Sequence, residues 1–209
     1  MALHQRGRRY AITSCNNVLM TNEDTGSERA LGRLTTAMVR GVARPRILVG
    51  GLGMGYTLRA ILDRLPRTGR VVVAELLPAV VRWNRERIGH LSRHSIDDPR
   101  VRLQITDVVN LVRQPRAWDA VVLDVDNGPE WIVQRRNLAL YGREGLTRLL
   151  RSLRPGGILA LWSSGRHRPF ERRMRAMAVR WRRYRCVSRP GQPTGPVLYI
   201  ARPPTRSSG

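Results

Sequence analysis

Lysine is absent from this sequence, so all 38 of its basic residues are arginine. Only 15 residues are acidic, which gives a formal net charge of +23 at pH 7. A basic surface of this kind suggests phosphate-rich or other anionic partners. The arginines are nevertheless scattered through every segment, which is typical of a composition bias, and aromatic residues that would stack on bases are few. We therefore expect nucleic acid to bind only non-specifically, through the arginines.

Cysteine and long apolar runs are also scarce. Cys15 and Cys186 are far apart and outside any metal-ligand spacing, which argues against a zinc site. They are typical of reduced thiols, and a disulfide between them is the alternative. No apolar run reaches the roughly 18 residues of a membrane span, and residues 1–10 contain no apolar stretch of the secretory kind. We expect a cytoplasmic protein that binds neither a metal nor a membrane.

From residue 46 onwards the chain alternates short apolar runs with helical patterns. The runs predict strands at 46–50, 70–75, 101–105, 120–123, 158–162 and 197–201, and the patterns predict helices at 55–65, 78–88, 107–113, 143–153 and 169–183, with a turn at 154–157. This alternation predicts an α/β fold, a Rossmann-like doubly wound and mostly parallel sheet of about seven strands. The chain before 197–201 is irregular and rich in Pro and Gly, so we expect this strand to enter antiparallel at the edge.

The residues before this region predict a smaller extension. Strand candidates at 10–13 and 18–20 flank an Asn-Asn pair that is compatible with a hairpin turn. Residues 25–28 fit a capping box, and leucine and methionine then recur at helical spacing. The expected organisation is a short β-hairpin over 1–24, one Rossmann-like domain over 25–202, and a disordered polar tail over 203–209.

The most informative motif is the strand-to-helix junction at 47–56. A β-branched run enters a cluster of four glycines, namely Gly50, Gly51, Gly53 and Gly55. Glycine permits tight turns and lets the main chain approach a ligand closely. About twenty residues further on, the next strand ends in Glu75, where an acid can accept hydrogen bonds from ribose hydroxyls. A tight turn without a ligand is the alternative for the glycines alone, and Glu75 counts against it.

Two further strand ends carry acidic residues, and ligands bind outside the carboxyl ends of strands in an open parallel sheet. Asp107 either accepts from an adenine amino group or caps the following helix. Asp124 begins the sequence Asp-Val-Asp-Asn, an acidic rim that suits an amine-bearing substrate and offers a general base. The alternative is a polar turn, because Asp and Asn are common in turns. The position of Asp124 after the most apolar strand favours a functional role.

Over roughly residues 18–163, these positions resemble the spermidine synthase-like (polyamine aminopropyltransferase-like) family of the class I S-adenosylmethionine-dependent methyltransferase fold. The resemblance implies that the four glycines, Glu75 and Leu76, and Asp107 and Val108 bind S-adenosylmethionine or its decarboxylated form. It implies that Asp124 is the catalytic base or orienting group. It also implies that Asp126, Asn127, Tyr141 and Glu28 contact a small-molecule amine substrate, although packing is an equal alternative for Tyr141. A homodimer without metal and a role in polyamine biosynthesis follow from the same resemblance.

Two departures from the family pattern leave the transferred group open. Gly26-Ser27-Glu28 stands where the family has Tyr-His-Glu, so only the glutamate remains. Leu52 and Met54 flank Gly53, where the family has an aspartate that helps accept the aminopropyl donor. We predict a transferase that alkylates an amine, moving aminopropyl from the decarboxylated donor or methyl from S-adenosylmethionine. A methyltransferase of another substrate and a non-catalytic basic relative that binds RNA or another anion are the alternatives.

Overall fold

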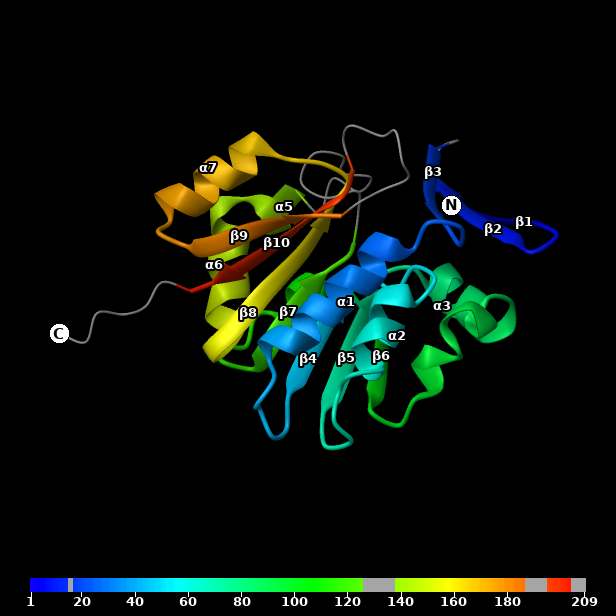
Figure 1. Cartoon of the computed structure of the whole chain (residues 1–209), viewed down its shortest axis with the longest axis horizontal. Coiled ribbons are helices and arrows are strands. Elements are labelled where there is room, and N and C mark those ends of the chain that lie inside the picture. Colours follow the sequence, from blue (N-terminus) through cyan, green and yellow to red (C-terminus); the bar gives the residue numbers. More distant parts are fainter. Residues whose placement is uncertain (15–16, 126–137, 187–194, 204–209) are drawn as a thin grey trace.

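The computed structural model describes residues 1–14, 17–125, 138–186 and 195–203. Its main element is a seven-stranded sheet with the order β6-β5-β4-β7-β8-β10-β9 (Figure 1). The strands are β4 (Arg46–Gly50), β5 (Arg70–Glu75), β6 (Val101–Ile105), β7 (Trp118–Leu123), β8 (Leu153–Ser163), β9 (Arg180–Arg185) and β10 (Val197–Arg202). The first five are parallel, and β10 pairs antiparallel with both β8 and β9. The predicted α/β fold with a mostly parallel sheet is confirmed.

Helices cover both faces of this sheet. They are α1 (Gly26–Met38), α2 (Tyr56–Leu62), α3 (Pro78–Glu86), α4 (Val108–Leu111), α5 (Leu138–Tyr141), α6 (Arg143–Ser152) and α7 (Arg168–Ala176), with two 3₁₀ turns at Gly89–Ser92 and Ser95–Asp97. Among the described residues, no helix combines the length and the apolar character that crossing a bilayer requires.

Alternate residues of the central strands enter two separate cores. In β4, Ile47 and Val49 pack with α1, α2 and α3, whereas Leu48 packs with α4, α5, α6 and α7 on the opposite face. In β7, Val122 enters the first core and Val121 the second. Each fully buried aliphatic side chain of this kind contributes about 1.5–3 kcal/mol relative to an exposed one. The continuous apolar runs seen in the sequence are therefore strands buried on both faces.

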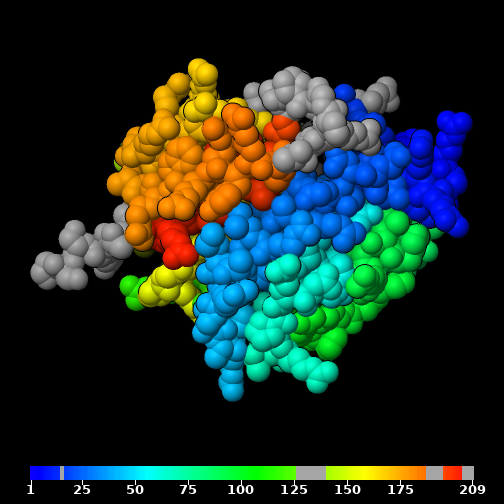
Figure 2. Space-filling view, viewed as in Figure 1, coloured from blue at the N-terminus to red at the C-terminus, as the bar shows by residue number. Residues whose placement is uncertain are grey.

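The N-terminal extension is a three-stranded antiparallel sheet rather than a hairpin. The predicted strands at 10–13 and 18–20 are β2 (Arg9–Ser14) and β3 (Asn17–Thr21), and β1 (Ala2–Arg6) adds to β2. The sequence did not predict β1, because its side chains are mostly exposed and show no apolar alternation. The Asn-Asn turn falls partly at residue 16, outside the described residues. This small sheet packs beside the main domain at the end of the molecule where α3 lies (Figures 1 and 2).

The predicted start of α1 is correct, but the predicted capping box is wrong. Thr25 is the N-cap residue and makes no side-chain capping hydrogen bond. Its Oγ1 instead accepts a hydrogen bond from Arg29 Nε at 3.1 Å. The Glu28 carboxylate accepts one from Ser27 Oγ at 2.7 Å, so this glutamate is not used for capping.

The predicted helix over 169–183 is half wrong. Helix α7 ends at Ala176, and Ala178 has a φ of 52°, which breaks the helical path. Trp181 and Tyr184 lie on strand β9, whose pairing with β10 overrides the helical spacing of the apolar residues. Strand β9 therefore forms the edge of the sheet, and β10, predicted at the edge, lies one place inside it.

The predicted turn at 154–157 lies within β8. The pairing of β8 with β7 is irregular at this point, since Leu153 pairs with Trp118 and Ile158 pairs with Ala120. Gly156 has a φ of +79°, which only glycine adopts easily. The Pro-Gly-Gly sequence therefore marks a bulge within a long strand, and not the predicted turn between two elements.

Candidate functional site

A cleft lies at the carboxyl ends of β4, β5, β6 and β7. It is partly open to solvent. Its lining comes from the strand ends, α1, α3, β8 and the N-terminal sheet. The residues are Met1, Ile12, Leu19, Met20, Glu28, Gly51, Gly53, Ala74, Glu75, Leu76, Leu77, Val80, Thr106, Asp107, Val108, Asp124, Val125 and Trp162.

The glycine turn forms the floor of this cleft. Gly51 has a φ of +89°, and a Cβ at this position would overlap the carbonyl oxygen of Asp124. Only glycine therefore allows the turn after β4 to lie against the end of β7. Gly53 also has positive φ and lines the cleft. Gly50 and Gly55 shape the turn without lining the cleft; Gly55 is the left-handed residue that precedes α2.

Glu75 holds the glycine turn against the end of β5. Its Oε2 accepts a hydrogen bond from the Leu52 backbone N–H at 2.8 Å, and its Oε1 accepts one from Leu77 N–H at 2.9 Å. Burial raises the pKa of this carboxyl, and the backbone N–H groups oppose that rise. The backbone N–H groups of Leu76 and Gly53 also favour the ionised carboxylate. The arrangement fits a ribose ligand, although the sequence did not predict the structural role.

Asp107 has the capping role that was one of its two sequence interpretations, and its contact with adenine stays a prediction. Its Oδ1 accepts a hydrogen bond from Val109 N–H at 2.9 Å, so it caps α4, and it also lines the cleft. The predicted Leu76 and Val108 line the cleft too, and Leu77 and Val80 extend the apolar wall. Acidic groups beside apolar walls suit a flat base with amino groups, as adenine is.

Asp124 lies at the opposite end of the cleft, directly after β7. Its Oδ2 accepts a hydrogen bond from Thr57 Oγ1 at 2.6 Å. Burial, and next the nearby carboxyl of Glu28, raises the pKa of Asp124 to about 7, although the Thr57 hydrogen bond opposes the rise. A carboxyl that titrates near neutral pH is matched to general base chemistry at that pH.

Glu28 brings a second carboxyl to the same end of the cleft. It lies on the first turn of α1, is 8% exposed, and accepts from Ser27 Oγ. Burial raises its pKa as well. The end of the cleft that contains Asp124 therefore has two carboxyl groups, and a cationic or amine-bearing ligand would relieve their mutual repulsion.

Sequence reasoning missed several residues of this site. In the sequence, Thr57 is indistinguishable from any other residue of a predicted helix, and Trp162 is part of a predicted buried strand. Trp162 lies beside Asp124 because Leu161 of β8 pairs with Leu123 of β7. It lines the cleft, and its indole N–H is buried without an acceptor in the described part of the chain. The N-terminal sheet contributes the apolar side chains Ile12, Leu19 and Met20.

Three predicted substrate contacts are not placed in the cleft. Tyr141 is 4% exposed and does not line it; its ring packs edge-on against Phe170 at 6.1 Å, which favours the packing alternative. Asp126 and Asn127 lie outside the described residues. Within the residues that are described, no group of three or more His, Cys, Asp or Glu side chains is placed to hold a metal. The absence of a metal remains a prediction.

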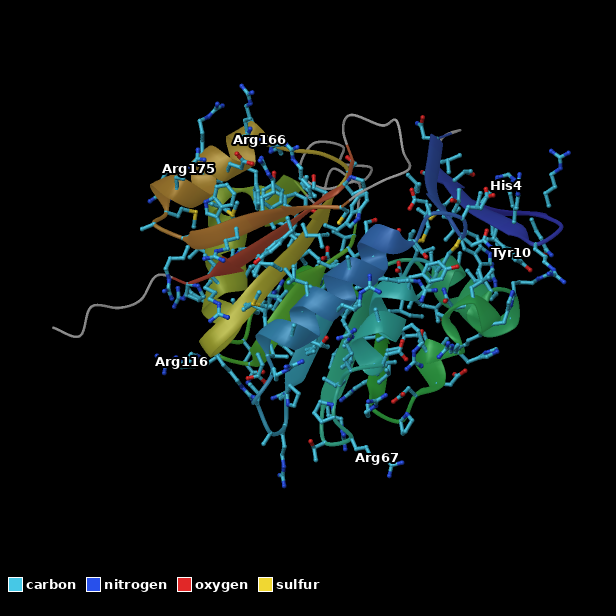
Figure 3. The ribbon with its side chains drawn as sticks, in the orientation of Figure 1. His4, Tyr10, Arg67, Arg116, Arg166 and Arg175 are labelled. Atoms are coloured by element: carbon cyan, nitrogen blue, oxygen red, sulfur yellow. The ribbon has the colours of Figure 1, made fainter. Side chains whose placement is uncertain are left out.

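Among the residues that the structure describes, no arginine lines the cleft. Arg67, Arg116, Arg166 and Arg175 project from widely separated parts of the surface (Figure 3). On α7, the acidic Glu171 is 1% exposed and forms ion pairs with Arg166 and Arg183. This distribution is consistent with a composition bias.

The fold and cleft together define a doubly wound α/β protein of the Rossmann-like class. Its cleft includes the carboxyl ends of β4 and β7, between which the strand order reverses, and such proteins bind nucleotide-type ligands at this point. The spermine/spermidine synthase domain model matches residues 36–175. The chain belongs to the spermine/spermidine synthase family.

Curated relatives of this chain are polyamine aminopropyltransferases, and they are longer than it is. Polyamine aminopropyltransferase 2 of Pseudomonas aeruginosa is 35% identical over 123 residues, which cover 56% of this chain and 33% of that protein. The polyamine aminopropyltransferase of Mycobacterium tuberculosis H37Rv is 32% identical over 123 residues, which cover 57% of this chain and 22% of that protein. The chain therefore matches only about a fifth to a third of the length of these relatives.

Solved structures share the fold at low sequence identity. Spermidine synthase from Thermotoga maritima has a TM-score of 0.68 at 16% identity, covering 97% of this chain and 72% of that one. Human methyltransferase-like protein 13 in complex with SAH has a TM-score of 0.61 at 15% identity, covering 88% and 82%. At such identities the likeness establishes the fold alone.

Proposed function

We propose that this protein transfers an alkyl group from an adenosyl-sulfonium donor to a small amine. The donor is decarboxylated S-adenosylmethionine or S-adenosylmethionine, and the names of the curated relatives favour aminopropyl transfer in polyamine biosynthesis. One observation carries the proposal. Asp124, whose pKa is raised to about 7, lines the same cleft as the glycine turn and Glu75. A base and a nucleoside-type site are thus combined at one sheet edge.

The donor half of the site uses residues from three strand ends. Glu75 would accept hydrogen bonds from the ribose hydroxyls, and Asp107 would accept from the adenine amino group. Gly51 and Gly53 allow the backbone to lie close to the ligand, and Leu76 and Val108 flank the base. When bound, the donor supplies a carbon attached to a positively charged sulfur, which is an activated leaving group.

The acceptor half orients an amine and receives its proton. The amine nitrogen forms a bond to the carbon beside the sulfur, while the carbon–sulfur bond breaks and its electron pair stays on sulfur. Asp124 takes the proton that the nitrogen loses. Because the sulfonium is already activated, alignment and proton removal are the main tasks left to the protein. Glu28 adds negative charge that attracts a cationic acceptor.

The test combines ligand titration with a base variant. Calorimetric titration of nucleic-acid-free protein with decarboxylated S-adenosylmethionine, S-adenosylmethionine and methylthioadenosine identifies the donor. Asp124→Asn should bind the preferred donor with unchanged affinity and lose about 10²–10⁴-fold in turnover, the usual contribution of general base catalysis. Asp97→Asn, at an exposed aspartate, is the matched control. Full turnover by Asp124→Asn would rule out the assigned base.

A methyltransferase is the second candidate, and it rests on the glycine turn. Leu52 and Met54 flank Gly53 in this turn, where the pattern of the spermidine synthase-like family has an aspartate that helps bind the aminopropyl donor. Preference for S-adenosylmethionine in the titration would select this candidate. Binding of no adenosyl compound would instead select a non-catalytic relative that retains RNA or another anion through its arginines.

The unit that carries this activity is residues 25–202, with the N-terminal sheet completing the cleft. The family resemblance favours a homodimer in the cytoplasm. Sedimentation or light scattering of purified protein measures the mass directly, and a monomer at micromolar concentration would count against the dimer.

A further inference from the structure

Thr57 links three elements that meet at the acidic end of the cleft. Its Oγ1 lies 2.6 Å from Oδ2 of Asp124 at the end of β7. The same atom lies 3.3 Å from the backbone carbonyl of Glu28 on α1. A hydroxyl carries one proton, and the shorter distance and the carboxylate partner make Asp124 the acceptor it favours.

The position of Thr57 is fixed by packing and not by the cleft. Thr57 is the second residue of α2 and is 4% exposed. Helix α1 approaches α2 so closely that a Cβ at Gly32 would lie 2.7 Å from the Thr57 carbonyl oxygen. Thr57 does not line the cleft, so its side chain can affect a ligand there only indirectly, through its hydrogen bond to Asp124.

We propose that Thr57 is a positioning residue that holds the Asp124 carboxylate by Oδ2 and leaves Oδ1 for the acceptor amine. Among the described residues no hydrogen-bond donor reaches Oδ1. The role rests on the function proposed above, in which Asp124 receives the proton. It also adds to that function, because the hydrogen bond sets how much of Asp124 is ionised and ready to act.

The groups around Asp124 raise its pKa, and the hydrogen bond from Thr57 opposes that rise. Glu28 on α1 is the charged group that raises the Asp124 pKa within the described part of the chain, and burial acts in the same direction. Glu28 itself interacts electrostatically with Asp24 and Arg29, which are close to it in sequence, and with Cys186, which directly follows β9. Thr57 is the group that lowers the Asp124 pKa against these effects. Its loss should therefore leave Asp124 protonated at neutral pH.

The experiment compares Thr57→Val with Thr57→Ser. Valine keeps the branched shape and removes the hydroxyl, whereas serine keeps the hydroxyl. We expect the Asp124 pKa, read from ¹³C carboxyl NMR, to rise by about one unit in Thr57→Val and to stay unchanged in Thr57→Ser. In the same proteins, the acid limb of the kcat/KM profile should move up by about one unit in Thr57→Val only, a loss of about fivefold at pH 7.

Thr35→Val is the matched control. Thr35 is a fully buried threonine on α1 whose hydroxyl donates to the Leu31 carbonyl at 2.8 Å, so this variant loses a hydroxyl away from Asp124. Its Asp124 titration should match the parent protein. Should Thr57→Val not fold, Thr57→Ala takes its place with the same expectation.

Two results would overturn the assignment: an unchanged Asp124 titration in Thr57→Val, or an equal shift in Thr57→Ser. Because the NMR titration needs no turnover, it also separates the two proposals. A shift confined to Thr57→Val in a protein that binds no adenosyl donor would sustain the Thr57–Asp124 hydrogen bond and refute the transferase.

Discussion

The backbone N–H of Met54 in the glycine turn donates a hydrogen bond to Sδ of Met20 in the N-terminal sheet, at 3.3 Å. The same sulfur would lie 3.0 Å from a Cβ at Gly53. The extension therefore closes directly over the turn that is proposed to hold the donor. Tyr10 and Ile12 secure it by packing against Met54, Tyr56 and Ile88.

Met20→Ala should weaken donor binding, and it also removes the sulfur that accepts from the Met54 N–H. It removes a side chain that lines the cleft and covers the turn, and we expect the donor Kd to rise about 3–10-fold, since a partly buried apolar contact is worth about 1 kcal/mol. Calorimetry measures this. Val18→Ala, on the same strand but with a 59% exposed side chain, is the control and should bind normally. Equal affinity in both variants would contradict a role for the N-terminal sheet.

Glu28→Gln should lower the pKa of Asp124. Glu28 raises the pKa of Asp124 through its negative charge, so removing that charge should lower the pKa from about 7. The acid limb of the kcat/KM profile should then move to lower pH, which is the opposite direction to Thr57→Val. An unmoved limb would show that Asp124 is not the group that the profile reports.

Asp124 should make stability fall as the pH rises from about 4 to 7. Its pKa in the folded protein is about 7, above the ordinary 3.8, so the folded state binds more protons in that window and loses stability as they leave. Asp124→Asn removes the cost of ionising a buried carboxyl. At pH 8 its free energy of unfolding should exceed that of the parent by on the order of 1–3 kcal/mol, with a smaller difference at pH 4. Equal pH dependence of unfolding in the two proteins would refute the raised pKa.

Glu75→Gln should reduce both donor affinity and stability. An amide offers one acceptor oxygen, so one of the Leu52 and Leu77 backbone N–H groups would face an NH₂ group and stay unpaired. Leaving a buried donor unpaired costs about 1–3 kcal/mol, and the ribose would lose an acceptor as well. We expect a lower thermal midpoint and at least about tenfold weaker donor binding. A variant that is destabilised but binds normally would leave Glu75 with a structural role alone.

The sequence was sufficient to predict six of the seven strands of the main sheet and the acids at the strand ends, because both follow from local patterns. Apolar runs predicted β4, β5 and β7. The position of Glu75 and Asp107 after the predicted strands 70–75 and 101–105 predicted that they lie at the same edge of the sheet, and both line the cleft. Thr57 and Trp162 were not predictable, because their roles depend on which helix or strand packs beside Asp124. Strand β9 was missed for the same reason, since pairing with a strand further along the chain outweighed the local helical spacing of Trp181 and Tyr184.

Gly51→Ala should be far more damaging than a comparable substitution elsewhere. An alanine at Gly51 would adopt a strained φ of +89° and its Cβ would overlap the Asp124 carbonyl, so the end of β7 has to move. Gly156→Ala is the matched control, because Gly156 has a φ of +79° but open space around its Cβ position. Gly156→Ala should cost about 1 kcal/mol of backbone strain, and Gly51→Ala at least about 3 kcal/mol together with loss of turnover. Denaturant unfolding of both variants measures the difference. Similar costs would mean that the close contact between the glycine turn and Asp124 does not organise the site.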